Sequence, residues 1–278
     1  MSQRIEKTGD SVAAPPRSSE RQMWIDADRI FYAGLLGTPT PRAFGAHAVY
    51  VALDGEVSVA IGEGEWQAGE LALVPANVTH RVACASPLIG ALHLEPETLD
   101  PAGLPGWLQG AGGVIDDPEL LRSVRQAYAD MRGAAPGAEL SDLDFDLTMF
   151  GQHLPVRRIE PRIAAVVDMI KRDPSGTLSA GACAASVQLS TGRFLHLFTQ
   201  QVGVPFRSFR SWKRARSLLH HVTRSTQLTD VAMDAGYPDA SHFSHTIRQV
   251  FGLPPKDIFA GSRRLVVHGR LPRGSGGR

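Results

Sequence analysis

Residues 230–255 read DVAMDAGYPDASHFSHTIRQVFGLPP, and a related segment lies 49 residues upstream. That segment, residues 181–206, reads GACAASVQLSTGRFLHLFTQQVGVPF. The offset pairs Phe194 with Phe243, and each copy closes on Gly-x-Pro, in which Gly ends a helix and Pro prevents its continuation. A matched pair of segments at a fixed offset indicates that the same structural unit occurs twice.

Each copy predicts two helices joined by a tight turn. In the first copy, Ser179 is placed to cap a helix over residues 180–186, and Ser190 to cap a second over residues 191–202. In the second copy, Asp239 takes the capping position. Two helices joined in this way, the second presenting small, polar and basic residues, are typical of a helix-turn-helix unit.

The outward face of each second helix is the candidate DNA-reading surface. A helix enters the major groove when its leading face is slim, and Arg and His supply donors for base edges or phosphates. A helical bundle with solvated Arg and His side chains is the alternative. The residues expected to contact DNA are Gly192, Arg193, His196, Gln200, Ala240, Ser241, Ser244, His245 and Arg248.

The charge distribution supports DNA as the partner of this half. Residues 1–154 carry 10 Lys and Arg against 21 Asp and Glu, a balance of −11. Residues 155–278 carry 19 against 7, a balance of +12, although the whole chain has a formal charge of only +1. A basic half joined to an acidic half indicates contact with a polyanion.

An apolar stripe between the two copies predicts one long connecting helix. At roughly 17–18 residues it would be ~26 Å long and would hold the two units rigidly apart. Successive major-groove faces lie ~34 Å apart, so the duplex would bend or one unit would reach its groove incompletely. The stripe consists of Phe209, Trp212, Ala215, Leu219 and Val222.

The N-terminal half alternates short β-like runs with turns, which is typical of an antiparallel sandwich or barrel. The expected strands are residues 48–53, 57–61, 71–74 and 88–94. Two helices should follow, and they could cover the barrel or form a subunit contact. Their apolar stripes are Leu120, Leu121, Val124, Tyr128 and Met131, and Leu143, Leu147, Phe150 and Leu154.

The chain is thus expected to be a multidomain α+β protein, with a β-barrel and helices followed by an all-α domain that folds on its own core. The expected boundaries are a disordered tail over 1–22, a sensing barrel over 23–98, a helical dimerisation segment over 99–154, a linker over 155–161, a DNA-binding domain over 162–262 and a flexible tail over 263–278.

Residues 178–259 resemble the DNA-binding domain of the AraC/XylS family of bacterial transcription regulators. The resemblance implies promoter DNA, a small-molecule effector and a second copy of the chain as partners, with RNA polymerase a candidate, and it departs at Tyr237, where Phe is usual, and at His245, where Arg is common. It rests on Ser190, Arg193, Phe194, His196, Leu197, Phe198, Gly203 and Arg214, and then on Asp230, Val231, Ala232, Gly236, Tyr237, Asp239, Ser241, His242, Phe243, Ser244, Gly252, Leu253, Pro254 and Pro255.

The β half resembles the cupin-like sensor of that family. Gly69, Pro75, Asn77 and His80 resemble the second cupin motif, and His47 resembles a remnant of the first. The first motif lacks its second His and its Glu, so neither a metal nor another cofactor is expected. The residues expected to line an effector pocket are His47, Tyr50, Trp66, His80 and His93.

The sequence therefore predicts an AraC-type transcription regulator without catalytic activity. A metal-dependent cupin enzyme with an appended helical domain and a DNA-binding protein without sequence preference are the alternatives. The chain shows neither an apolar stretch long enough to span a membrane nor an N-terminal secretion signal, so a cytoplasmic location is expected.

Overall fold

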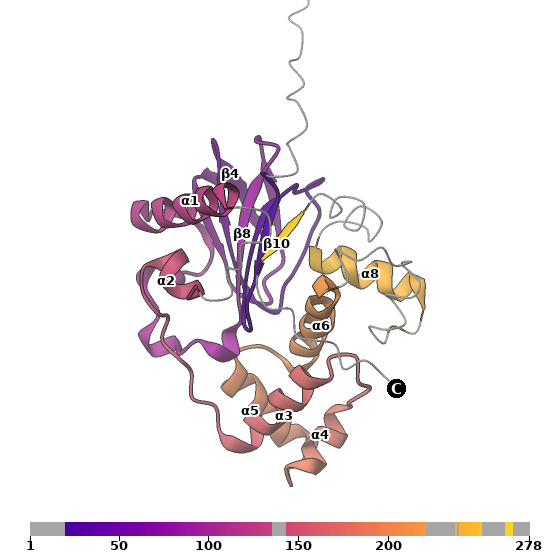
Figure 1. The fold of residues 1–278 in the computed structure, drawn as a ribbon. Helices are drawn as coiled ribbons and strands as arrows, with labels where there is room; N and C mark the ends of the chain where they lie inside the picture. The colour runs from indigo at the N-terminus through magenta and orange to yellow at the C-terminus, as the bar shows by residue number, and fades with distance from the viewer. Residues whose placement is uncertain (1–19, 135–142, 221–236, 238, 252–264, 269–278) are drawn as a thin grey trace, which may run out of the picture.

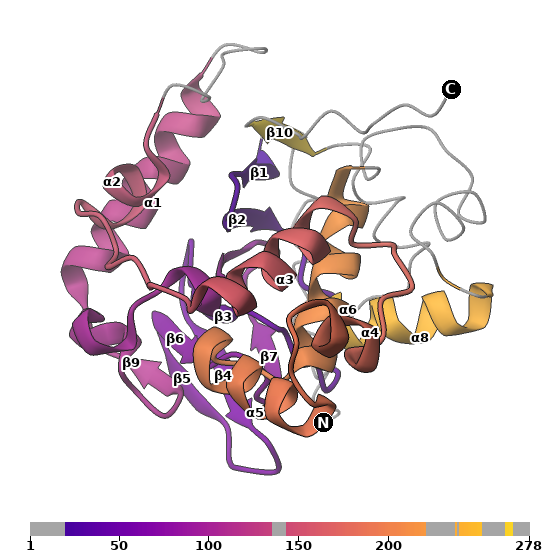
Figure 2. The ribbon, with the colours of Figure 1, turned by 90° about the horizontal axis from the view of Figure 1, so that it is seen from below.

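The computed structural model describes residues 20–134, 143–220, 237, 239–251 and 265–268. Two β-sheets form the N-terminal part, and helices lie on several sides of them (Figure 1). Helices α1 and α2 lie on one side of the sheets, α6 and α8 lie on the other, and α3, α4 and α5 gather below (Figures 1 and 2). The expected combination of a β domain and a helical domain is confirmed.

The larger sheet has the strand order β10-β1-β2-β8-β3-β6-β9, and the smaller has the order β5-β4-β7. Within the described part of the chain, all strand pairings in the sheets are antiparallel except that of β1 with β10. The strands are β1 (Gln22–Ile25), β2 (Arg29–Gly34), β3 (His47–Val51), β4 (Val57–Ile61), β5 (Gln67–Gly69), β6 (Leu71–Val74), β7 (His80–Cys84), β8 (Ile89–Leu94), β9 (Gly113–Ile115) and β10 (Val266–His268).

The four strands expected from alternation are present as β3, β4, β6 and β8. The turn of the second cupin-like motif is also as expected, since Asn77 adopts a positive φ of 64° and His80 is fully buried. Residues 67–69 and 71–74 form β5 and β6, which belong to different sheets. A sandwich permits this because a short bend at Glu70 passes the chain from one sheet to the other.

Helices cover the outer face of the larger sheet. The apolar side of α1 packs there as its stripe predicts. Of the two alternatives, covering the sheet or forming a subunit contact, this helix therefore covers the sheet. The helical elements are η2 (Pro96–Thr98), η3 (Pro101–Gly103), η4 (Gly106–Leu108), α1 (Pro118–Gly133), α2 (Phe145–Phe150), α3 (Pro161–Arg172), α4 (Ala180–Ser186), α5 (Thr191–Val202), α6 (Phe206–Ser217), η6 (Leu218–His220) and α8 (Ala240–Phe251).

The stripe expected for the second of these helices is wrong in part, since Phe150 and Leu154 pack against the cluster on the larger sheet but Leu143 and Leu147 do not. Helix α2 has only six residues and buries Phe145 and Met149, whereas Leu143 and Leu147 are 52% and 48% exposed. Asp144 caps the helix and Gly151 ends it in the left-handed conformation, so the helix is too short to align the expected positions.

The connecting helix is shorter than its stripe predicts. Helix α6 ends at Ser217 and continues as the 3₁₀ turn η6 to His220, and Val222 lies outside the described residues. The first helix of the second unit, expected around residues 228–235, also lies outside them. Among the described residues, no helix is long and apolar enough to cross a membrane.

The expectation that each half has its own core is wrong in part. Helices α3, α4 and α5 share a core with the start of α6. The rest of α6 and α8 instead join the interior of the sandwich, where Trp212, Phe243 and Ile247 belong to one cluster with Tyr50. Strand β10, within the range expected as a flexible tail, lies beside β1 at the edge of the larger sheet (Figures 1 and 2).

Candidate nucleic-acid interface and interdomain cavity

Helix α5 separates a buried face from an exposed one. The Ser190 hydroxyl accepts a hydrogen bond from the Arg193 backbone N–H, and Gly203 ends the helix at a φ of 88°. Phe194 and Phe198 are fully buried, and both rings pack edge-on against Phe206. The opposite face is exposed and carries Gly192, Arg193, His196 and Gln200.

Helix α8 repeats this arrangement. The Asp239 carboxylate accepts a hydrogen bond of 2.7 Å from the His242 backbone N–H, so the expected cap is present. Phe243 and Ile247 are buried. Of the expected DNA contacts on this helix, Ser241, His245 and Arg248 are exposed, Ser244 is half-buried, and the side chain of Ala240 lies outside the described residues.

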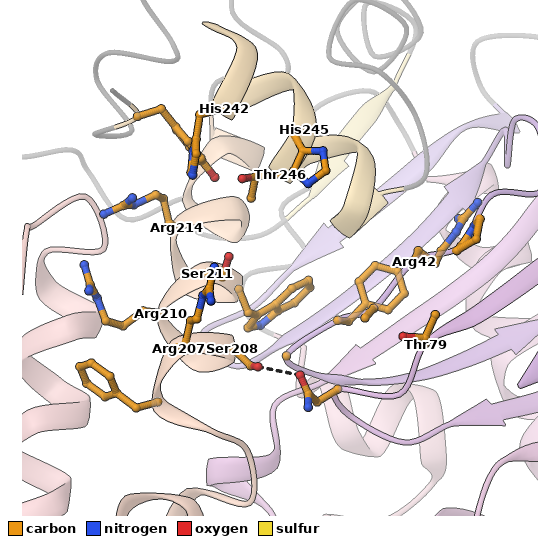
Figure 3. A pocket seen from close by; sticks show the side chains of 18 residues that line it. Arg42, Thr79, Arg207, Ser208, Arg210, Ser211, Arg214, His242, His245 and Thr246 are labelled. Atoms are coloured by element: carbon orange, nitrogen blue, oxygen red, sulfur yellow. Dashed lines mark hydrogen bonds between the residues drawn. The ribbon is translucent and has the colours of Figure 1, made fainter. Parts of the chain in front are cut away.

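Helix α6 follows the first helix pair and also contacts the β domain. The Ser208 hydroxyl donates a hydrogen bond of 2.6 Å to the Asn77 side chain (Figure 3). The Trp212 indole N–H donates one of 3.0 Å to the Glu95 carboxylate. Helix α6 is therefore anchored on the β domain.

A buried ionic cluster strengthens this anchor. Lys213 bonds to Glu95 and, at 2.6 Å, to Glu97, while Lys171 of α3 lies 3.2 Å from Glu97 and 2.5 Å from Asp28. Burial favours the protonated form of Glu95, but Lys213 and Arg216 outweigh it and lower its pKa. Burial and the neighbouring Glu95 raise the pKa of Glu97.

These acidic residues also have the spacing of a metal site. The carboxylates of Asp28, Glu95 and Glu97 lie close enough to share a cation. In the structure, the ammonium groups of Lys171 and Lys213 provide the positive charge between them. The donor set fits an ion-paired interface better than a metal, since each lysine occupies the position that a cation would take.

Three of the expected effector residues meet inside the sandwich. The Tyr50 hydroxyl lies 2.7 Å from His80 Nε2, and the Val78 carbonyl accepts a hydrogen bond of 3.0 Å from Nδ1. Because a carbonyl can only accept, Nδ1 carries the hydrogen and Nε2 accepts from tyrosine. The Phe44 ring packs against the rings of both His80 and His93.

Burial keeps these histidines neutral. It lowers the pKa of His80 to about 4 and that of His93 to about 3. Burial also raises the pKa of the Tyr50 phenol well above its ordinary value. At neutral pH the cluster therefore offers polar atoms without formal charge.

The other two expected effector residues lie elsewhere. His47 lies three positions before Tyr50 on β3. Because successive side chains of a strand alternate between the two faces of the sheet, His47 faces the opposite side from Tyr50. Trp66 is 45% exposed, and the Arg81 guanidinium lies 5.2 Å from its ring centroid. The structure thus brings together Tyr50, His80 and His93 but not the whole expected set.

A cavity of about 660 Å³ lies between the two domains. Residues of the β2–β3 and β6–β7 loops form one side, and α6 with α8 forms the other side (Figure 3). The labelled lining residues are Arg42, Thr79, Arg207, Ser208, Arg210, Ser211, Arg214, His242, His245 and Thr246.

Sequence reasoning missed most of this cavity. Arg42 and Phe44 lie in an irregular loop, and the arginines of α6 resemble an ordinary solvated helix face. The signal that could have drawn attention to α6 is its RSWKRAR run, residues 210–216, because it surrounds a Trp with four cations. The pattern alone does not show that this run faces the sensor.

Comparison with known proteins supports a helix-turn-helix assignment. Residues 183–261 match the family model described as "Helix-turn-helix domain". A 71-residue part of the chain is 32% identical to the invasion protein InvF of Salmonella typhi, and equally to that of Salmonella typhimurium. The matched part covers 25% of this chain and spans a third of the length of InvF.

Solved structures of ToxT from Vibrio cholerae resemble the larger part of the chain. An apo variant superposes with a TM-score of 0.55 at 9% identity, covering 85% of this chain and 98% of ToxT. Wild-type ToxT bound to an unsaturated fatty acid gives 0.51 at 10% identity, with 85% and 96% covered. At these identities the likeness shows a common two-domain fold. The C-terminal part of the chain therefore carries a helix-turn-helix domain, within a fold that it shares with ToxT.

Proposed function

We propose that the chain binds a specific promoter sequence and regulates transcription under the control of a small-molecule effector bound in its N-terminal domain. The observation that carries the proposal is the pair of capped helices, α5 and α8, whose exposed faces hold small, polar and basic residues in the half with a charge balance of +12. Slim cationic helix faces of this kind suit the major groove.

Each unit has assigned roles in this proposal. On α5, Arg193 and His196 contact base edges or phosphates. Gln200 contacts the DNA backbone, and Gly192 permits the helix to approach the DNA closely. On α8, Ser241 and His245 read bases, with Ser244, Ala240 and Arg248 beside them. The protein performs no reaction of its own.

The effector is proposed to act through the sandwich interior and its neighbours. Tyr50, His80 and His93 supply polar atoms there, with His47 and Trp66 as outlying members of the expected set. ToxT with a bound unsaturated fatty acid supports the idea that a fold of this kind accommodates a small ligand. Ligand binding shifts the protein between domain arrangements by its difference in affinity for them.

The exposed Leu143 and Leu147 beside α2 are the proposed contact with a second copy of the chain. Two exposed leucines four positions apart form a small apolar patch that a homodimer would cover. RNA polymerase is a further candidate partner of the DNA-bound protein.

Duplex binding by the full chain tests the proposal. A duplex enriched by repeated selection from random sequence should bind roughly 10³-fold or more tightly than unrelated duplex. Log K should fall steeply as log salt rises, because phosphate contacts release counterions. Equal affinity for all sequences would favour the non-specific DNA-binding alternative, and stoichiometric metal in the purified protein would favour the cupin-enzyme alternative.

A further inference from the structure

Arg157 joins the β domain to the end of helix α5. Its Nε–H donates a hydrogen bond of 2.8 Å to the Leu99 carbonyl, and its Nη1–H donates one of 2.6 Å to the Gln201 carbonyl. The Arg157 backbone N–H donates to the Thr98 carbonyl at 3.1 Å, so the residue itself is fixed on the β domain. One guanidinium can span the boundary in this way because its donors point in fixed, diverging directions.

The contact is made at the last turn of α5. Gln201 is the second-last residue of the helix, where the backbone carbonyls have no partner within the helix. A cation at that end also interacts favourably with the helix dipole. The Gln201 side chain adds a second contact, since its Oε1 accepts a hydrogen bond of 3.0 Å from the Glu160 backbone N–H. The segment expected as a linker therefore holds the end of α5 from outside the helix.

The end of α5 also packs closely against η2. Gly203 ends the helix at a φ of 88°, and a Cβ there would lie 3.3 Å from the Pro96 Cβ and 3.6 Å from Arg157 Nη2. The helix end thus lies in contact distance of both the β domain and the guanidinium. While Arg157 is in place, this end of α5 has little room to shift.

The two proposed DNA-contacting helices are held on the β domain by different contacts. Helix α8 joins the core of the sandwich through Phe243 and Ile247. Helix α5 belongs to the core that it shares with α3 and α4, and its Phe198 ring centroid lies 5.4 Å from that of Phe209 on α6. Without the Arg157 contact, α5 should therefore stay folded while its C-terminal end shifts relative to α8.

We propose that Arg157 is a positioning residue, which holds α5 at the distance and angle from α8 that a two-part DNA site requires. The inference rests on the proposed function and adds a route by which the β domain controls the first of the two helices. A direct contact of Arg157 with a DNA phosphate is the competing role. The two roles differ in their effect on sequence discrimination, because phosphate contacts carry no sequence information directly.

Arg157 also lies near the strand that carries part of the proposed effector cluster. Burial lowers the pKa of His47 to about 4, and the Arg157 guanidinium contributes to that shift. His47 begins β3, and Tyr50 follows on the same strand. A change in the position of β3 can therefore reach α5 through one side chain.

Binding of the full chain to a selected duplex and to its single-base variants tests the role. The positions read by α5 are defined as those at which Arg193→Ala loses discrimination, and those read by α8 are defined in the same way by His245→Ala. Arg157→Met should weaken binding to the selected duplex by roughly tenfold and lose discrimination at the α5 positions alone. The salt dependence of its binding should match that of the wild type, because no phosphate contact is removed.

Two further variants separate position from charge. Arg157→Lys keeps the charge but lacks the planar fork that reaches both carbonyls, so it should lose discrimination as Arg157→Met does. Arg158→Met is the matched control, because Arg158 is exposed and its side chain makes no hydrogen bond or ion pair with the residues that the structure describes. A uniform loss across all positions in Arg157→Met, or a wild-type profile in either Arg157 variant, would overturn the proposal.

Amide hydrogen exchange of the full chain without DNA tests the contact itself. Arg157→Met should exchange faster than the wild type in the last turn of α5, residues 199–202, with α8 unchanged, whereas Arg158→Met should match the wild type. Equal exchange of this turn in Arg157→Met and the wild type would also overturn the proposal. Because no DNA is present, that failure differs from failure of the proposed function, which would be a wild type without sequence preference.

Discussion

The buried side chains of His80 and His93 make the stability of the sandwich depend on pH. Each ring packs against Phe44, and burial lowers the pKa of His80 to about 4 and of His93 to about 3. The unfolded chain protonates such a ring below its ordinary pKa of 6.5, whereas the folded protein does not until the pH is far lower. The contribution of each histidine to stability is therefore complete above pH 6.5 and is lost as the pH falls toward 4.

This predicts that the stability of the β domain falls steeply in acid. By pH 4.5, each of these two histidines should have cost about 2–3 kcal/mol of unfolding free energy relative to pH 7. His93→Phe retains an aromatic ring and should reduce that loss by about one histidine's share, as measured by urea unfolding at the two pH values. His196→Phe, at an exposed position, is the control, and a wild-type pH slope in His93→Phe would contradict the interpretation.

At the scale of elements, helix α6 packs into two different cores and so joins the first helix pair to the sandwich. It carries Phe209 into the core of the first unit and Trp212 into the core of the sandwich. Close approach is possible because Gly45 has no side chain: a Cβ there would lie 2.5 Å from the Trp212 Cβ and 3.1 Å from the Ser208 carbonyl oxygen. The neighbouring atoms belong to a buried ring and a helix backbone, which cannot easily move.

Gly45→Ala should therefore weaken the docking of α6 on the sensor. The overlap is of the overpacking kind, which typically costs about 1–3 kcal/mol. Thermal unfolding should show the lowered Tm, and limited proteolysis should show faster cleavage between the domains. Gly106→Ala adds a methyl group in open space and should change neither measurement. A Tm for Gly45→Ala equal to that of the wild type would contradict the close docking.

Substitutions of Gly192 test whether the exposed face of α5 enters the DNA groove. Its missing Cβ meets no atom within 4 Å, so a side chain fits without disturbing the fold. Gly192→Ala should leave folding intact or improve it by about 0.5–1 kcal/mol. Gly192→Leu should keep the Tm but weaken binding to the selected duplex by roughly tenfold or more, because its bulk faces the groove. Undiminished affinity in Gly192→Leu would move the DNA contact away from this face.

The sequence predicted those elements whose signals are local. The caps at Ser179, Ser190 and Asp239 follow from side chains that satisfy the first backbone N–H groups of a helix, and all three are present. Alternation likewise predicted β3, β4, β6 and β8. These features depend on neighbouring residues in the chain.

Features that depend on distant partners could not be predicted in this way. Strand β10 has three residues and forms only because β1 offers an edge more than 240 positions away. The shape of the interdomain cavity depends on how α6 and α8 dock against two loops of the β domain. His47 was expected in the effector pocket because it resembles a remnant of the first cupin motif, but the alternation of strand side chains places His47 and Tyr50 on opposite faces of β3.

The two domains behave as one packed molecule. Helix α8 shares its core with the sandwich, and Glu95 and Glu97 pair with Lys213 across the boundary. The segment expected as a linker is also held in place, since Arg157 donates hydrogen bonds to the carbonyls of Leu99 and Gln201. Domain movement must therefore break a buried ionic and aromatic interface.

A fragment of residues 155–278 should accordingly be less stable than the full chain. It loses the sandwich contacts of Trp212, Phe243 and Ile247, and it leaves Lys213 without its carboxylates. Calorimetry should show a lower and broader transition for the fragment, with increased binding of a hydrophobic dye. A fragment that melts at the full-chain Tm would show that the shared core contributes little.

The central claim is that two helices of one chain read two separate parts of a DNA site. It is tested most directly by measuring how every single-base substitution in the selected duplex changes the affinity of the wild type, of Arg193→Ala and of His245→Ala. The account predicts that each variant loses discrimination, by about 1–3 kcal/mol, in its own group of positions, and that the two groups lie about 10 bp apart. A uniform loss across all positions in both variants would contradict it.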